Sequence, residues 1–388
     1  MRNTAEIIQS ARCTGCTACF AVCPKSAISL TRDAHGFLTP TIDEGACIGC
    51  GKCLKVCPCN VMEGERKPIA AFACRTPDKE LRDACTSGGF VSALAERVIE
   101  SGGVAYGARF ENGVKKVRHA QFADLPSLAA FSSSKYVQSD CSEVIKGLVD
   151  GSLSHKGLFV GSPCQVAALK NALGKRSDDL LTVDFACRGV PSPGVYEQYC
   201  RYQESVHGAS IKSLVFRKKT YGYHGSTMSI EFDNGDTHEG NVKTDQMLSA
   251  FFSGYSPRPS CADCHMRKTS GLSDITVFEC WHFESFTGIK DDNSGYTTVL
   301  LNTERGRAAF DDLKQKLEIH ELDSQQAMKV DGFILRENPP AASNVGAFWD
   351  LFASYGFGPK MEKFLGISHV DKMRAWMKRR LFSIKSDK

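Results

Sequence analysis

Short apolar segments alternate with amphipathic segments between residues 69 and 317 of this chain. Apolar residues recur at helical spacing over 90–100, and Gly102-Gly103 ends that helix before an apolar strand over 104–110. Further strands are predicted over 157–161, 180–186 and 226–232, with a helix over 166–173. A last strand over 297–302 precedes a helix over 304–317. We therefore expect an α+β fold whose main sheet is mixed, with antiparallel parts.

The first 63 residues have a different character, because they are dense in cysteine and contain an internal repeat. Residues 13–24 resemble residues 47–58, and a polar stretch over 63–68 is typical of a linker. Beyond residue 320 the chain continues into a segment that becomes basic near its end. The sequence thus predicts three parts, covering residues 1–63, 69–320 and 321–388.

Both repeats have the spacing C-x2-C-x2-C-x3-C-P. In this arrangement three cysteines wrap one face of a [4Fe–4S] cubane, and the fourth reaches the other cubane. The block resembles the bacterial ferredoxins with two [4Fe–4S] clusters over its whole length, and two complete runs favour cubanes over structural zinc. The expected ligands are Cys13, Cys16, Cys19 and Cys57 for the first cluster, and Cys23, Cys47, Cys50 and Cys53 for the second.

Composition and charge narrow the function further. A chain of 388 residues is long enough for two or three domains, and a net charge of +4 gives no argument for nucleic-acid binding. No apolar run of membrane-spanning length and no signal peptide appear, so we expect a cytoplasmic protein. Its 18 cysteines then point to metal rather than to disulfides.

Four further cysteines occupy positions suited to a site. Cys164 lies at the predicted start of a helix, where the helix dipole would lower its thiol pKa, and Cys187 ends a strand. Cys261 and Cys264 form a C-x2-C pair in a turn-rich stretch. From spacing alone, zinc, a third cubane and unconnected buried thiols all stay open.

A second cofactor site is suggested by Thr86-Ser87-Gly88-Gly89, directly before the helix over 90–100. Small residues at a helix start leave N–H groups open to a phosphate, although a capped helix start looks similar. A stretch over 132–139 gathers hydroxyls around Lys135 and Tyr136, as a nucleotide site does, but a polar loop is an equal alternative.

The C-terminal stretch from residue 361 to 388 is basic, with apolar residues between the cations. A basic amphipathic helix of this kind can lie on an anionic membrane or dock on an acidic partner. The alternative is a solvated helix that packs its apolar side on its own domain.

Taken together, these motifs resemble the beta subunit family of coenzyme F420 hydrogenases and dehydrogenases from about residue 70 to 320. The resemblance rests on Thr86–Gly89 and on the stretches 134–139, 161–165, 187–189, 258–264, 273–276 and 291–295. It implies an iron–sulfur flavoprotein with FAD beside a third [4Fe–4S] cluster, and so favours a cubane over zinc. The cluster ligands would be Cys164, Cys187, Cys261 and Cys264, and FAD would be bound by Ser87, Gly88, Gly89, Ser134, Lys135, Tyr136, Ser139 and Asp274.

One departure from the family affects the substrate. The family usually continues after Ser273–Thr276 with a Gly-Asp pair, whereas this chain has Phe278 and Glu279. The expected function is an FAD- and iron–sulfur-dependent oxidoreductase that links a hydride carrier, such as coenzyme F420, to a one-electron carrier protein. Alternatives are a ferredoxin-dependent reductase of another organic substrate, a non-catalytic electron-transfer subunit of a larger complex, and a zinc-stabilised binding domain. No residue pattern identifies a catalytic acid, base or nucleophile.

Overall fold

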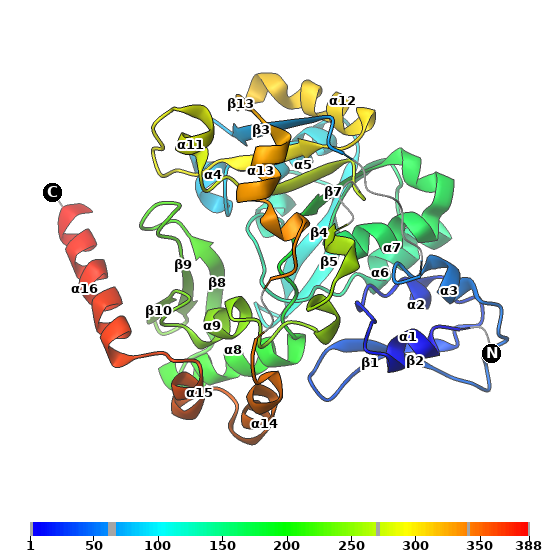
Figure 1. Ribbon diagram of the computed structural model, residues 1–388, viewed down its shortest axis with the longest axis horizontal. Coiled ribbons are helices and arrows are strands. Elements are labelled where there is room, and N and C mark those ends of the chain that lie inside the picture. The colour runs from blue at the N-terminus through cyan, green and yellow to red at the C-terminus, as the bar shows by residue number, and fades with distance from the viewer. Residues whose placement is uncertain (1–2, 61–66, 269–271, 340–341, 387–388) are drawn as a thin grey trace.

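A computed structural model describes residues 3–60, 67–268, 272–339 and 342–386, with side chains described up to residue 380. The N-terminal unit carries its two cysteine-rich loops on a two-stranded antiparallel sheet and three short helices (Figure 1). Ile28 pairs with Ile42 at the end of this ladder. Residues 63–66 of the predicted linker lie outside the described residues. The elements are α1 (Ala5–Gln9), α2 (Ala18–Ala21), β1 (Ile28–Arg32), β2 (Leu38–Ile42) and α3 (Lys52–Val56).

The centre of the molecule is an eight-stranded mixed sheet with the strand order β13-β3-β12-β11-β7-β6-β4-β5. This confirms the expected α+β fold with a mixed sheet. Four of its strands, β4, β6, β7 and β12, match the predicted strands within one residue, whereas the other four were not predicted. The strands are β3 (Ala70–Arg75), β4 (Val104–Glu111), β5 (Lys116–Phe122), β6 (Gly157–Val160), β7 (Leu180–Phe185), β11 (Ile275–Glu279), β12 (Thr297–Leu301) and β13 (Glu318–Leu322).

Helices cover both faces of this sheet because successive apolar residues of its strands point to opposite faces. Leu158 faces α5 (Phe90–Glu100) and α12 (Glu304–Leu313), whereas Phe159 faces α6 (Ser142–Asp150) and α7 (Pro163–Leu173). The helix predicted over 304–317 is shorter than expected, because residues 314–316 tighten into a 3-10 turn. On the second face α13 (Ser324–Val330) covers β3.

A smaller three-stranded sheet continues the chain between β7 and β11. Its strands pack against helices from both the middle and the end of the chain, around one large aromatic core that includes Phe37 of the N-terminal unit. The strand predicted over 226–232 belongs here rather than to the main sheet. The elements are α8 (Pro193–His207), β8 (Ile211–Lys218), β9 (Thr227–Phe232), β10 (Thr237–Gly240), α9 (Gln246–Phe252), α14 (Val345–Tyr355) and α15 (Pro359–Phe364).

The chain ends in α16 (His369–Ser386), which runs along one side of the molecule (Figure 1). Among the helices that the structure describes, none combines the length and the apolar composition needed to cross a bilayer.

Strand direction separates two edges of the main sheet. Strands β4, β6, β7 and β11 are parallel neighbours, and β3 runs the same way because it is antiparallel to β12, which is antiparallel to β11. The loops that follow these five strands therefore meet at one edge, where open sheets build their ligand sites. Residues that precede β11, including Asp274, lie at the opposite edge.

Asp274 stabilises that opposite edge. Its buried carboxylate pairs with Arg305 at 2.8 Å and accepts hydrogen bonds from Thr182 and Thr303. Although burial opposes its charge, these partners hold the pKa of Asp274 below its usual value. The carboxylate is thus occupied within the protein.

We predict that Asp274→Asn lowers the free energy of unfolding by about 2 kcal/mol at neutral pH, because it leaves the half-buried Arg305 guanidinium without its counter-ion and breaks buried hydrogen bonds to the carboxylate. Anaerobic urea unfolding followed by circular dichroism measures the change. Because the pKa of Asp274 is lower in the folded protein than in the unfolded chain, the stability difference between the two proteins should be complete at neutral pH. It should shrink only below about pH 4, where the Asp274 carboxyl becomes protonated first in the unfolded chain and then in the folded protein.

Asp312→Asn is the matched control, because Asp312 pairs with Arg97 on the exposed side of α12. Little change is expected from it, since solvent screens exposed pairs. Equal effects from the two variants would contradict a structural role for the Asp274 ion pair.

Candidate functional site: three cysteine groups and a helix-start cradle

The first predicted cluster site comes together from both cysteine runs. The Cys16 thiol lies close enough to Cys13, Cys19 and Cys57 for each to affect its pKa, which burial raises well above the usual range. Burial, with Cys13 and Cys57 nearby, likewise raises the pKa of Cys19 to about 12. Cys16 and Cys19 are buried, and Cys13 and Cys57 are half-buried. A buried thiol carries negative charge only beside a cation, so the donor set suits a metal cluster.

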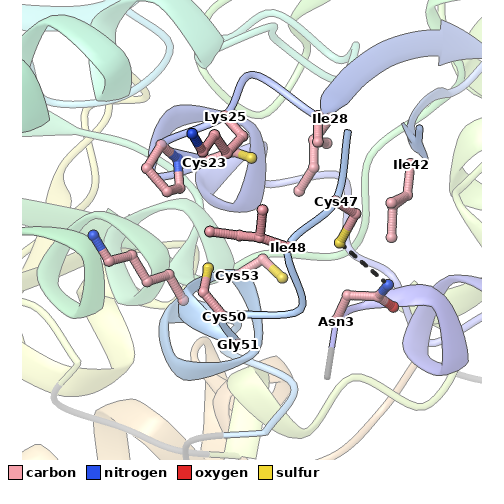
Figure 2. Close-up of a pocket in the computed structure, with 13 residues that line it drawn as sticks. Asn3, Cys23, Lys25, Ile28, Ile42, Cys47, Ile48, Cys50, Gly51 and Cys53 are labelled. Carbon is pink, nitrogen blue, oxygen red and sulfur yellow. Dashed lines mark hydrogen bonds between the residues drawn. The ribbon is translucent and has the colours of Figure 1, made fainter. Parts of the chain in front are cut away.

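The other four ferredoxin cysteines line a single pocket (Figure 2). Cys23, Cys47, Cys50 and Cys53 surround a small open space whose walls include three isoleucines. The Asn3 amide donates to the Cys47 sulfur at 3.8 Å. Cys50 is exposed, so this second group lies at the surface, where a soluble partner can approach it.

The third cysteine group forms where the parallel strands of the main sheet end. Cys164 lies in the first turn of α7 after β6, and Cys187 follows β7. Cys261 ends a 3-10 turn (η3, Pro259–Cys261), and Cys264 precedes α10 (His265–Lys268). All three of the other thiols affect the pKa of Cys164, so the structure brings these four distant positions together.

Burial, rather than the helix start, decides the chemistry of Cys164. Burial first, and then the three neighbouring thiols, raise its pKa well above the usual range. The expectation of a lowered pKa is therefore wrong, because desolvation outweighs the helix dipole.

Among the described residues no three of the His, Cys, Asp or Glu side chains approach closely enough to hold a single metal ion, and this applies equally to the ferredoxin cysteines.

A buried arginine holds the third group in place. Arg267 donates to the carbonyls of Cys187 at 2.7 Å and of Cys261 at 3.2 Å, and to the Asn338 side chain at 3.0 Å. Its guanidinium counteracts the rise in the pKa of Cys187, which burial lifts to about 12. Arg267 thus joins two cysteine loops and supplies positive charge beside them.

Arg258 connects this third group to the first ferredoxin loop. Its guanidinium donates to the Leu38 carbonyl at 2.6 Å and the Cys13 carbonyl at 3.4 Å, and to Gln138 at 3.1 Å. It also lies over the Phe37 ring, 4.7 Å from the centroid. Because Arg258 precedes Cys261 by three residues, one side chain fixes the distance between the two cysteine loops.

Two hydrogen-bonded connections run between these groups. Ser260, the neighbour of Cys261, donates to the Cys13 carbonyl at 3.0 Å. On the other side, the Cys141 thiol donates to the Cys16 carbonyl at 3.3 Å. Gln165, the neighbour of Cys164, donates to the sulfur of Cys141. The third group is thus bonded to the first through its protein frame on two sides.

The loop before α5 packs tightly on the end of the sheet. The Gly88 N–H donates to the Thr297 hydroxyl at 2.9 Å, and the Ser87 hydroxyl contacts the same group at 2.6 Å. A Cβ on Gly88 would collide with the Cys74 carbonyl, so only glycine fits there. The Thr86 hydroxyl bonds to Ser134 at 2.9 Å, which brings the two stretches predicted to bind FAD side by side. We call these residues, 86–89 and 132–135, the helix-start cradle.

Two half-buried lysines, Lys135 within the helix-start cradle and Lys219 beside it, supply positive charge at this position. Lys219, from the turn after β8, donates to the carbonyls of Ser87 at 2.5 Å and Ser294 at 3.1 Å, and burial lowers its pKa to about 8. Burial lowers the pKa of Lys135 to about 7, and its ammonium donates to backbone carbonyls of residues 130–133. The hydrogen bonds of the Lys135 ammonium are therefore made to its own loop, which is contrary to the predicted direct contact with a phosphate. The buried Ser133 hydroxyl, in contrast, has no hydrogen-bond partner among the described residues.

The remaining residues predicted for FAD are dispersed. Tyr136 packs among Phe216, Phe251 and Phe252. Ser139 bonds to the His119 ring at 2.9 Å, on the side that faces the ferredoxin unit. Asp274 lies at the opposite edge of the sheet. The structure thus gathers Ser87, Gly88, Gly89, Ser134 and Lys135, and places the other three elsewhere.

The departure from the family pattern has a clear structural counterpart. Phe278 enters the core beside α13, where Gly332 leaves room for its ring. Glu279 pairs with Arg217, whose guanidinium lies 4.8 Å from the Trp281 ring centroid. Tyr223 stacks on the other side of this cluster, and its buried hydroxyl has no partner in the described part of the chain.

Several of these residues were not predicted from the sequence. Lys219, Arg267 and Thr297 lie in none of the motifs, and each acts through contacts with segments far away in the chain. Arg258 and Gln138 lie within the stretches 258–264 and 134–139, but nothing in those motifs predicts that the two side chains bond to each other.

Comparison with known proteins agrees with this architecture. Residues 12–61 match the 4Fe-4S dicluster domain, and residues 155–325 match the C terminus of the coenzyme F420 hydrogenase/dehydrogenase beta subunit. A coenzyme F420 hydrogenase subunit beta from Methanococcus voltae is 25% identical over 245 residues, which cover 61% of this chain and 78% of the relative.

A chain from a xenon-derivatised structure of the F420-reducing [NiFe] hydrogenase complex of Methanosarcina barkeri superimposes with a TM-score of 0.47. The two chains are 17% identical, and the match covers 67% of this chain and 85% of the other. The two family matches show that this chain combines an N-terminal 4Fe-4S dicluster domain with the C-terminal domain of the coenzyme F420 hydrogenase/dehydrogenase beta subunit family.

Proposed function

We propose that this chain is an iron–sulfur flavoprotein oxidoreductase. FAD would exchange a hydride with an organic carrier such as coenzyme F420, and [4Fe–4S] clusters would exchange single electrons with a protein carrier. The observation that carries this proposal is that residues 86–89 of the helix-start cradle and the half-buried Cys164 and Cys187 follow strands at the same edge of the main sheet, while the protein frame around the third cysteine group is hydrogen-bonded to the first ferredoxin loop. The relative's name supports coenzyme F420 as the hydride carrier.

The helix-start cradle fits a phosphate-bearing cofactor. The cradle precedes the 11-residue helix α5, whose first-turn N–H groups could bind a phosphate. The hydroxyl of Ser133 is buried without a partner among the described residues. Lys219 ties the cradle to the loop before β12, and an anion beside it would favour its charged form. A bound flavin supplies the conversion between a two-electron hydride and single electrons.

The third cysteine group fits a [4Fe–4S] cluster in this scheme. Cys164, Cys187, Cys261 and Cys264 supply four thiolates, and Arg267 offsets part of their negative charge. Cys50, at the exposed end of the second ferredoxin group, is where a protein carrier would approach. In this proposal the division into residues 1–63, 69–320 and 321–388 corresponds to the one-electron part, the flavin part and a C-terminal extension.

A second candidate is a ferredoxin-dependent reductase of a different organic substrate. The observation that favours it is the cluster of Arg217, Glu279, Tyr223 and Trp281, which stands where the family usually has a Gly-Asp pair. The buried Tyr223 hydroxyl could bind an oxygen of such a substrate. The two candidates share the cofactors and differ in the donor.

We predict that Cys164→Ala removes about four of about twelve iron atoms per chain, because it deletes one ligand of the third cluster only. Metal analysis of anaerobically purified protein measures the loss, and the two ferredoxin clusters should remain. Cys200→Ala is the control, since Cys200 is buried in the aromatic core beside Tyr196 and should leave iron unchanged. Unchanged iron in Cys164→Ala, or zinc in place of iron, contradicts this ligand set.

Lys219→Met should weaken FAD binding by roughly tenfold, because it removes a charged donor that holds two loops of the cradle. Equilibrium dialysis against FAD gives the affinity, and the iron content should not change. Lys212→Met provides the comparison, since Lys212 is exposed on β8, the strand that leads to Lys219. Equal FAD affinity in both variants would rule out this role for Lys219.

The choice of donor is decided by anaerobic titration of the holoenzyme. Reduced coenzyme F420 should bleach the flavin absorption within the dead time of manual mixing. Bleaching by reduced ferredoxin but not by reduced F420 would favour the second candidate. A purified protein with no flavin spectrum and only about eight irons would contradict both.

A further inference from the structure

The C-terminal helix α16 turns its apolar side chains toward solvent. Met373 is 55% exposed, Trp376 50%, Val370 49% and Met377 43%. Val370, Met373 and Met377 recur at i, i+3 and i+7, so they share one face, and Trp376 borders it. An exposed tryptophan within a stripe of large apolar side chains is uncommon on a soluble surface and marks an interaction site.

The helix is attached to the body by its polar side instead. The Lys372 ammonium pairs with Glu362 at 2.6 Å, and Arg379 donates to the Glu239 carbonyl at 3.1 Å. Ala375, which lies between these two positions on the same face, is half-buried. A surface helix ordinarily packs its apolar stripe inward. The expectation that α16 packs its apolar side on its own domain is therefore wrong, because its ion pairs are made on the opposite side.

The charges beside the exposed stripe have one sign. Arg374, Lys378 and Arg380 are exposed, and the Arg380 guanidinium lies 4.5 Å from the Trp376 ring centroid. The acidic residue of the helix in this region is Asp371, whose carboxylate accepts a hydrogen bond from Ser368 at 2.5 Å. A second copy of α16 would bring like charges together, so the charge pattern selects an anionic surface.

We propose that α16 docks this protein on an anionic lipid surface. The apolar stripe would enter the boundary between headgroups and acyl chains, while Arg374 and Lys378 face lipid phosphates. Trp376 would lie at the depth of the headgroups, at the membrane–water interface, where tryptophan is enriched. Helix α16 runs along the outside of the molecule, and no other element covers its outer side in Figure 1. A flat surface can therefore reach the stripe along its length. The helix also lies beyond residues 155–325, which match the family.

The test is co-sedimentation of the full-length holoprotein with vesicles under anaerobic conditions. The protein should pellet with phosphatidylcholine vesicles that contain phosphatidylglycerol, should stay in solution with pure phosphatidylcholine, and should be released by high salt. Trp376 fluorescence should shift to the blue on binding. The comparison that isolates this signal is Trp376→Phe, which retains binding and loses the shift.

Two sets of variants separate the apolar and electrostatic contributions. Met373→Glu combined with Met377→Glu should reduce vesicle affinity by at least roughly a hundredfold, since each removes an apolar side chain that would enter the lipid and adds repulsion. Arg374→Gln combined with Lys378→Gln should reduce it roughly 25-fold, at about fivefold per charge. All four side chains are exposed, so iron and flavin content should stay unchanged.

Matched controls carry the same chemical changes elsewhere on the surface. Val206→Glu alters an exposed apolar residue of α8, and Lys175→Gln with Lys314→Gln removes two exposed charges far from α16. These variants should bind as the unmodified protein does. The proposal is overturned if the unmodified protein stays in solution with anionic vesicles, or if the α16 variants and the controls bind equally well.

Discussion

The buried Arg258 guanidinium is the interaction on which the arrangement of the cysteine groups depends. A buried arginine must satisfy its donors, and here backbone carbonyls of the ferredoxin unit and the Gln138 side chain accept them. Gln138 in turn donates to the Thr14 carbonyl at 2.9 Å. Gly15, at a φ of 67°, approaches both side chains so closely that a Cβ would collide with them. This contact therefore fixes the first ferredoxin loop to the segment that carries Cys261.

The direction of five strands explains why the other parts of the site meet. Since β3, β4, β6, β7 and β11 all run the same way, the loops after them share an edge, although they come from positions more than 100 residues apart. Residues 86–89 of the helix-start cradle follow β3, and Cys164 and Cys187 follow β6 and β7. The same geometry explains why Asp274, which precedes β11, pairs with Arg305 away from that edge.

Charge is distributed in a way that suits each part of the molecule. Arg258 and Arg267 are buried beside groups of thiols, where their charge counteracts the mutual repulsion of thiolates. Lys135 lies within the helix-start cradle and Lys219 beside it, and burial lowers the pKa of both ammonium groups. The cations of α16 remain outside, next to apolar side chains. The modest net charge of +4 thus hides three separate concentrations of positive charge.

The sequence by itself determined the features that depend on residues only a few positions apart in the chain. The two cysteine runs specify their cluster loops, because residues two or three apart must share one turn. The spacing of apolar residues along the chain predicted α5, β4, β7 and β12 closely, because the repeat of apolar positions decides which side chains a helix or strand can bury on one face. Only the tertiary structure decided which distant segments meet. The pairing of β6 with β7 brought Cys187 to Cys164, and the bridge between Pro191 and Pro257 brought the Cys261 segment there. Backbone carbonyls surround the Lys135 ammonium, and polar contacts on one side of α16 leave its apolar stripe facing outward. Such outcomes depend on burial and long-range contacts, which no local pattern records.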